Sequence, residues 1–167
     1  MPFPWSVVVP IVPVLVLVHG GPWGRDAWGL HPDHQWLANR GYAVLSVNFR
    51  GSAGYGRAFS DIKLGDVGHA IQADLRAAVD TLVAQGAVDP QRTAWFGFSY
   101  GGYAVLLEAS THPESLACGV SEAGPPRFQL LGSPAADPRT VSRPLLIVQG
   151  QKDRRARPGA VRHFADR

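Results

Sequence analysis

The sequence predicts an α/β fold with a mostly parallel sheet of about five strands and helices on both faces. Two observations support this. Short, continuous apolar runs rich in Val, Ile and Leu alternate with segments of helical periodicity, and each run ends in a glycine-rich or polar turn. Runs of this kind are typical of strands buried on both faces, and strands that alternate with helices pair in parallel. The five expected strands are residues 14–18, 42–47, 93–98, 116–121 and 145–149.

The expected helices lie between and after these runs. Residues 33–40 end at Gly41, and apolar side chains recur at helical spacing over residues 67–82, before Gly86. A glycine directly after a periodic segment is a common helix end. Residues 100–111 end before a proline, which disfavours continued helix. A last helix over 160–167 should turn Val161, Phe164 and Ala165 toward the sheet.

Composition sets further expectations. The 167 residues fit one domain, 1–167, with no propeller domain, and a net charge of +3 with scattered arginines does not predict a nucleic-acid partner. Nothing suggests a metal or cofactor. The apolar run at residues 7–18 is short and interrupted by prolines, so we expect neither a membrane span nor a signal peptide, and place the chain in the cytoplasm. Cys118 is the only cysteine, expected as a buried thiol.

Ser99 is the strongest candidate for chemistry. It lies in Gly97-Phe98-Ser99-Tyr100-Gly101-Gly102, directly after an expected strand and at the start of an expected helix. This is the Gly-x-Ser-x-Gly nucleophile elbow in the context that it requires, because the sharp turn projects the serine hydroxyl clear of the sheet. It makes the α/β-hydrolase fold the specific prediction. The alternative is a structural strand-to-helix turn.

The other candidates follow the ends of further strands, at the edge where sites form in parallel sheets. His19-Gly20-Gly21-Pro22 suggests that the backbone N–H groups of Gly21 and Tyr100 form an oxyanion hole. The alternative is a Gly-Gly turn without a role. His19 itself is expected to brace this loop. Asp153, after the last strand, is placed where this fold keeps the carboxylate that orients a histidine.

Two further residues are candidate substrate contacts. Arg50, in the loop after the second strand, would contact a substrate carboxylate or, as the favoured interpretation, form a structural ion pair. Trp23 follows the His-Gly-Gly-Pro run and is the second candidate.

Four motifs in order resemble the catalytic domain of the prolyl oligopeptidase family of serine peptidases, nearest to its acylaminoacyl-peptidase and dipeptidyl-peptidase-like branch. They are His19–Trp23, Asn48–Ser52 with Gly54-Tyr55-Gly56, Gly97–Tyr103, and Pro144–Gly150 with Asp153. The resemblance implies Ser99 as nucleophile, Asp153 as orienter, and Gly21 with Tyr100 as oxyanion donors. It also implies cleavage of peptide, acyl-amino-acid or ester bonds.

The chain departs from that family in three ways. We expect no β-propeller in these 167 residues, and only residues 126–143 connect the fourth and fifth strands. The resemblance implies that the catalytic histidine follows a further helix and strand, which would lie beyond residue 167. His163 is the only histidine after Asp153, but its helical position points it away from Val161 and toward solvent. His112, at the far end of the helix that Ser99 opens, would lie about 20 Å away.

Three functions therefore stay open at this stage. The first is a compact serine hydrolase with an open site, acting on esters or extended substrates. The second is a shortened, catalytically impaired family member, whose exposed edge at the fifth strand invites homo-oligomers. The third is a module that binds acyl or carboxylate groups without turnover. The first is preferred.

Overall fold

The structure of the chain is a computed structural model that describes residues 11–128 and 132–167. The first part of the apolar run at residues 7–18 therefore lies outside the described residues. Five strands form one parallel sheet in the order β2-β1-β3-β4-β5. They are β1 (Val12–Val18), β2 (Ala43–Ser46), β3 (Val88–Phe98), β4 (Cys118–Glu122) and β5 (Leu145–Val148). The expected sheet is confirmed, and β3 begins five residues earlier than expected.

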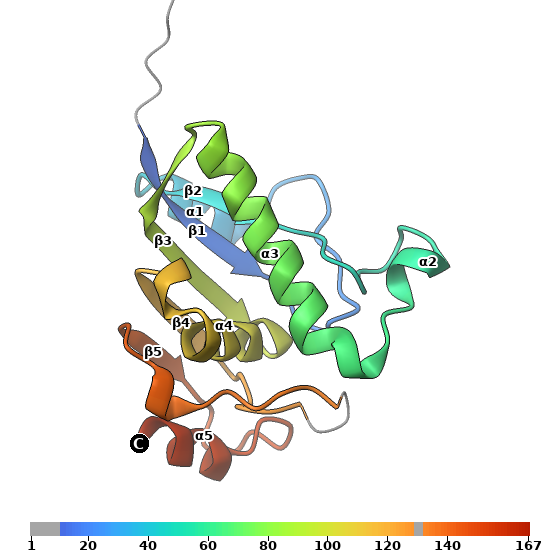
Figure 1. Cartoon of the computed structure of the whole chain (residues 1–167), viewed down its shortest axis with the longest axis vertical. Coiled ribbons are helices and arrows are strands. Elements are labelled where there is room, and N and C mark those ends of the chain that lie inside the picture. The colour runs from blue at the N-terminus through green and yellow to red at the C-terminus, as the bar shows by residue number, and fades with distance from the viewer. Residues whose placement is uncertain (1–10, 129–131) are drawn as a thin grey trace, which may run out of the picture.

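The α-helices are α1 (Pro32–Ala38), α2 (Arg57–Ser60), α3 (Val67–Ala84), α4 (Tyr100–Thr111) and α5 (Pro158–Ala165). Short 3₁₀ helices lie at Leu64–Asp66, Pro113–Ser115 and Pro138–Thr140. In Figure 1, α3 and α4 cross in front of the sheet and α1 lies behind its β2 end. Helices therefore lie on both faces, as expected for strands buried on two sides.

Helix α4 is the centre of the core. All its residues from Tyr100 to Ser110 are buried, between the sheet and α3 on one side and the chain around α5 on another. Val16, Val18 and Trp95 point toward it from the sheet. A helix with apolar side chains all round it is stable only when it is buried on every side. The packing around α4 therefore holds in position the helix that begins directly after Ser99.

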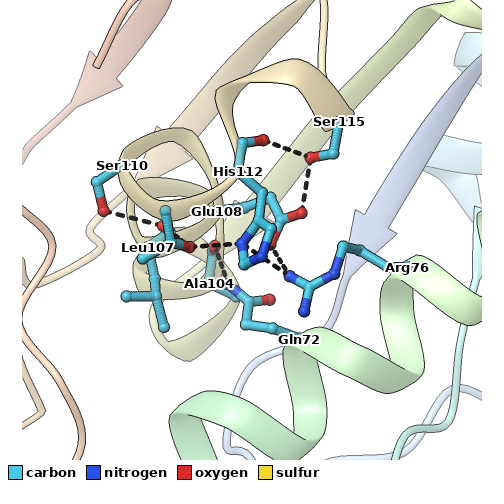
Figure 2. A network of polar contacts seen from close by, with 9 residues as sticks. Gln72, Arg76, Ala104, Leu107, Glu108, Ser110, His112 and Ser115 are labelled. Atoms are coloured by element: carbon cyan, nitrogen blue, oxygen red, sulfur yellow. Dashed lines mark hydrogen bonds and ion pairs between the residues drawn. The ribbon is translucent and has the colours of Figure 1, made fainter. Parts of the chain in front are cut away.

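A polar cluster joins the far end of α4 to α3 (Figure 2). Glu108 is fully buried, and its carboxylate accepts hydrogen bonds from Arg76 Nη1 (2.8 Å) and Ser115 Oγ (2.6 Å). The same Arg76 nitrogen lies 3.2 Å from His112 Nδ1. Burial raises the pKa of Glu108 above its ordinary value, and the arginine opposes this.

Val161 and Phe164 of helix α5 are buried, as expected, and Phe164 packs in one cluster with Leu106 of α4 and the partly buried Leu145 and Ile147 of β5. Two expectations about burial are wrong. Ala165 is exposed, because it is the last residue of α5 and only Val161 and Phe164 of this helix are buried. Cys118 is exposed because β4 points it to the face opposite α4, which no described helix covers at β4.

That uncovered part of the sheet carries several large apolar side chains. Phe98 is 57% exposed, Leu146 59% and Val148 45%. The strand register aligns Phe98 with Glu122 and Val148, and Val120 with Leu146, so these residues share one face with Cys118. We call this set (Phe98, Cys118, Val120, Leu146 and Val148) the outer apolar face. The edge strand β5 borders it, as the sequence predicted.

Within the described ranges, no helix combines the length and the apolar character needed to cross a bilayer.

Candidate active site

Ser99 lies in the sharp turn between β3 and α4. Its backbone has φ 56° and ψ −112°, a left-handed conformation that is costly for a residue with a Cβ atom. Its N–H donates to the carbonyl of Glu122 on β4 (2.9 Å), and its carbonyl accepts from the N–H of Tyr103 (3.0 Å). The side chain does not cap the helix. The hydrogen bonds with β4 and with the first turn of α4 therefore keep the strained backbone in place. The turn itself does not use the side-chain hydroxyl of Ser99.

Two glycines make this turn possible. A Cβ atom on Gly101 would lie 2.0 Å from the carbonyl oxygen of Val18, and one on Gly97 would lie 2.4 Å from the oxygen of Gly101. Strand β1, strand β3 and helix α4 therefore meet with backbone against backbone. The contact distances require the two glycines of Gly-x-Ser-x-Gly here, as the predicted sharp strand-to-helix turn demands; the role of Ser99 as nucleophile stays a prediction.

The His-Gly-Gly-Pro loop after β1 lies directly beside Ser99. A Cβ atom on Gly20 would be 3.7 Å from the Cβ of Ser99 and 3.4 Å from the carbonyl oxygen of Phe98. Gly21 has φ +127°, a backbone conformation that a residue with a side chain could adopt only with strain. The loop that carries the predicted oxyanion donor Gly21 thus reaches the nucleophile turn.

His19 braces this loop, as predicted. Its ring stacks on Phe49 with centroids 4.2 Å apart, and its Nε2 lies 3.0 Å from Ser52 Oγ in the loop after β2. Its Nδ1 lies 2.9 Å from the carbonyl oxygen of Gly20. Both ring nitrogens have partners within these two loops.

Asp153 lies in the turn after β5. Its Oδ1 accepts from the backbone N–H groups of Arg155 (2.8 Å) and Ala156 (3.0 Å), and its Oδ2 accepts from Gln149 Nε2 (3.2 Å). The hydrogen bond from Arg155 is the main cause that lowers the pKa of Asp153, so the carboxylate is ionised at neutral pH. Strand β4 lies between β3 and β5, so the turns that carry Ser99 and Asp153 follow strands on either side of it. Ala123, directly after β4, donates its N–H to the carbonyl of Val148 at the end of β5.

The structure brings no histidine to Ser99 or Asp153: within residues 11–128 and 132–167, neither side chain has a hydrogen bond with an imidazole nitrogen. His163 is exposed on α5, as its helical position predicted. It lines a groove of about 480 Å³ with residues that include Asp137, Arg139 and Phe164. His112 contacts Arg76 at the far end of α4, and His34 Nε2 lies 2.8 Å from Ser46 Oγ.

Arg50 forms the structural ion pair that was the favoured interpretation. Its Nε and Nη2 donate to the carboxylate of Asp74 on α3, the shortest distance being 2.7 Å, and Nη2 also donates to the carbonyl of Ala70. Trp23, in the same loop as Gly21, is exposed, and its role as a substrate contact stays a prediction.

Two contacts around the site were not expected from the sequence. The sequence pattern predicts Gln149 only as the end of a strand, whereas its side chain donates to Asp153 Oδ2. The sequence pattern predicts no separate role for Asn48 within its motif, whereas its amide links the two loops beside Ser99. A polar residue directly after a buried strand is the signal that marks both positions.

The parallel sheet, the strained serine between strand and helix, and the glycine loop beside it define an α/β-hydrolase domain. Comparison with known proteins narrows this class. A family model described as the prolyl oligopeptidase family matches residues 28–131. Dipeptidyl aminopeptidase BIII of Pseudoxanthomonas mexicana is 40% identical over 179 aligned residues, covering 87% of this chain and 26% of that protein. The chain belongs to the prolyl oligopeptidase family of serine peptidases.

Other relatives agree. Dipeptidyl peptidase family member 6 of Caenorhabditis elegans is 43% identical over 71% of this chain and 16% of its own length. A puromycin-hydrolyzing peptidase from Mycobacterium tuberculosis superposes with a TM-score of 0.84 at 29% identity, over 93% of this chain and 28% of that one. An acylaminoacyl peptidase with a bound chloromethyl ketone, at 24% identity and a TM-score of 0.83, shares the fold. The chain spans between 16% and 30% of the length of these proteins.

Proposed function

We propose that this domain is a serine hydrolase that cleaves peptide, acyl-amino-acid or ester bonds through an acyl-enzyme on Ser99. The observation that supports it most directly is the strained backbone of Ser99, held with the glycine loop of Gly21 beside it. Strain at a non-glycine residue persists only where the surrounding structure enforces it, and such residues cluster at functional sites. The relatives described above, a dipeptidyl aminopeptidase and a dipeptidyl peptidase family member, support the same class of reaction.

In the proposed reaction, Ser99 Oγ attacks the substrate carbonyl and gives up its proton. The carbonyl oxygen becomes an oxyanion, which the N–H groups of Gly21 and Tyr100 stabilise. The bond to the leaving group then breaks, and that group takes up a proton. Water attacks the acyl-enzyme, releases the acid and returns the proton to Ser99. Asp153, ionised and at the same edge of the sheet, stabilises the positive charge of the histidine that carries the proton.

His163 is the candidate for that histidine, because it alone follows Asp153 in the chain. To act, its ring must leave the groove that it shares with Asp137 and Arg139. The alternative is an impaired enzyme that acylates Ser99 without this base. An oxyanion hole and substrate binding alone retain roughly 10³–10⁴-fold acceleration over water, enough for activated esters but not for amides, whose leaving group needs a proton.

The experiment measures hydrolysis of a p-nitrophenyl ester and of an acyl-amino-acid p-nitroanilide by the chain and three variants. Ser99→Ala should abolish both activities, whereas Ser142→Ala, at an exposed serine before β5, should leave both unchanged. His163→Ala should reduce both if His163 is the base. Ester activity that His163→Ala leaves unchanged, without anilide activity, supports the impaired alternative. Ester hydrolysis that survives Ser99→Ala contradicts the proposal.

A further inference from the structure

The loop that carries Gly21 is a long excursion after β1 that has to hold its shape beside Ser99. It bends tightly, because Cβ atoms on Gly21 and Gly24 would each lie about 2.5 Å from backbone atoms of the same loop. No helix or strand lies between β1 and α1 to stiffen it. Its geometry must therefore come from contacts with a neighbouring segment.

The neighbouring segment is the loop after β2, and one side chain of that loop makes the strongest link. The Asn48 amide takes both main-chain polar groups of Asp26: its Oδ1 accepts from Asp26 N–H (2.9 Å), and its Nδ2 donates to the Asp26 carbonyl (2.9 Å). The second hydrogen of Nδ2 is donated to the hydroxyl of Tyr55 (2.8 Å). All three contacts are short, and they use the amide oxygen and both amide hydrogens.

Other contacts point the same way. Ala53 N–H donates to the carbonyl of Gly24 (3.2 Å), and the guanidinium of Arg25 lies over the ring of Tyr55 at 5.2 Å. Together with the His19–Ser52 contact, these hold the loop on both sides of Gly21. Asn48 stands out because one substitution removes three hydrogen bonds and leaves the sheet, α4 and Ser99 untouched.

We infer that Asn48 is a positioning residue for the oxyanion donor Gly21. It acts through Asp26 and Tyr55 and does not itself touch the reacting atoms. This inference rests on the proposed function, because it assigns Asn48 a role in that same site. Its physical basis is that an oxyanion donor is effective only when it is held at the correct place before the reaction starts.

The expected size of the effect follows from that dependence. Losing an oxyanion donor outright costs about 10²–10³-fold in rate, and a displacement of about 1 Å can cost about 10²-fold. Asn48→Ala leaves the His19–Ser52 and Gly24–Ala53 contacts in place, so the loop should loosen without leaving the site. We therefore expect a loss of about tenfold.

The test follows phosphonylation of the chain by a fluorophosphonate, in which the bond from Ser99 Oγ to phosphorus forms, the phosphorus–fluorine bond breaks and the hydroxyl proton passes to solvent. Asn48→Ala should lower the maximal rate about tenfold, while the reagent concentration at half-maximal rate changes less than about twofold. Asn39→Ala, at the other asparagine of the chain, is the control and should react as the unchanged protein does. Tyr55→Phe removes one of the three hydrogen bonds and should cost less than Asn48→Ala.

Asn48→Asp supplies a readout that a purely structural role would not affect. Its carboxylate keeps the acceptor for Asp26 N–H but repels the Asp26 carbonyl, and only the protonated acid can donate there. Its rate relative to the unchanged protein should therefore rise as the pH falls. No labelling of Ser99 in the unchanged chain would refute the proposed function itself. Normal labelling with an unaltered rate in folded Asn48→Ala would overturn the role of Asn48.

Discussion

The buried ion pair behind the site gives a stability prediction whose size follows from the structure. Arg76→Met removes the cation 2.8 Å from Glu108, whose carboxylate is fully buried, and leaves Ser115 as its remaining side-chain partner. Breaking a buried pair by removing one partner typically costs about 3–5 kcal/mol. Arg76 is itself 26% exposed, so water can partly replace it, and we expect about 2–3 kcal/mol at neutral pH.

The dependence on pH follows from the raised pKa of Glu108. Neutral Glu108 suits the buried site, so its contribution to the free energy of unfolding is full below the ordinary pKa of 4.5 and is lost as the pH rises through the folded-state pKa. Arg76→Met raises that pKa further. Each pH unit above the ordinary value adds at most about 1.4 kcal/mol to the cost of keeping the acid neutral, so the loss should be large at pH 7 and under about 1 kcal/mol at pH 5.

Urea unfolding followed by far-ultraviolet circular dichroism at pH 5 and pH 7 measures both free energies. In a thermal melt at pH 7, the melting temperature of Arg76→Met should be lower than that of the unchanged chain by about 5–10 °C. The double variant Arg76→Met with Glu108→Gln removes the buried charge and should recover most of the loss. An equal loss at both pH values, or a double variant no more stable than the single one, would refute the reasoning.

Two other predictions concern the elbow and the sheet edge. Gly101→Ala should prevent native folding, because its Cβ would lie 2.0 Å from Val18 O, whereas Gly159→Ala, with nothing within 4 Å, should leave the melting temperature unchanged within a few degrees. Circular dichroism melts compare the two, and a native melt for Gly101→Ala would disprove the close contact. We also propose that β5 and the outer apolar face form homo-oligomers. Leu146→Lys should then shift sedimentation toward monomer and speed maleimide labelling of the exposed Cys118. Sedimentation as a monomer before the substitution contradicts this.

The sequence predicted the elements that carry strong local patterns. The five strands, the boundaries of α4 and the buried Val161 and Phe164 of α5 all follow from periodicity and from proline or glycine signals. The elbow at Ser99 was predictable because its glycines are required by backbone contacts that recur wherever this turn occurs.

What could not be predicted depends on segments far apart in the chain. Alternation along β4 shows that Cys118 and Gly119 face opposite sides, but which side a helix covers is decided by α4 and α5. The burial of Glu108 with Arg76, and the contact of Asn48 with Asp26, join residues more than twenty positions apart. Local patterns contain no information about such pairs, because each partner alone is an ordinary polar residue.

The proposal that Ser99 forms a covalent intermediate is tested most directly by mass spectrometry of the chain after reaction with a fluorophosphonate. A single adduct should appear, and fragmentation should place it on Ser99 within the sequence Gly97-Phe98-Ser99-Tyr100. Prior unfolding in urea and Ser99→Ala should each prevent it, whereas Ser142→Ala should not. An adduct at another residue, or equal labelling of the unfolded chain, would contradict an active site built around the strained turn at Ser99.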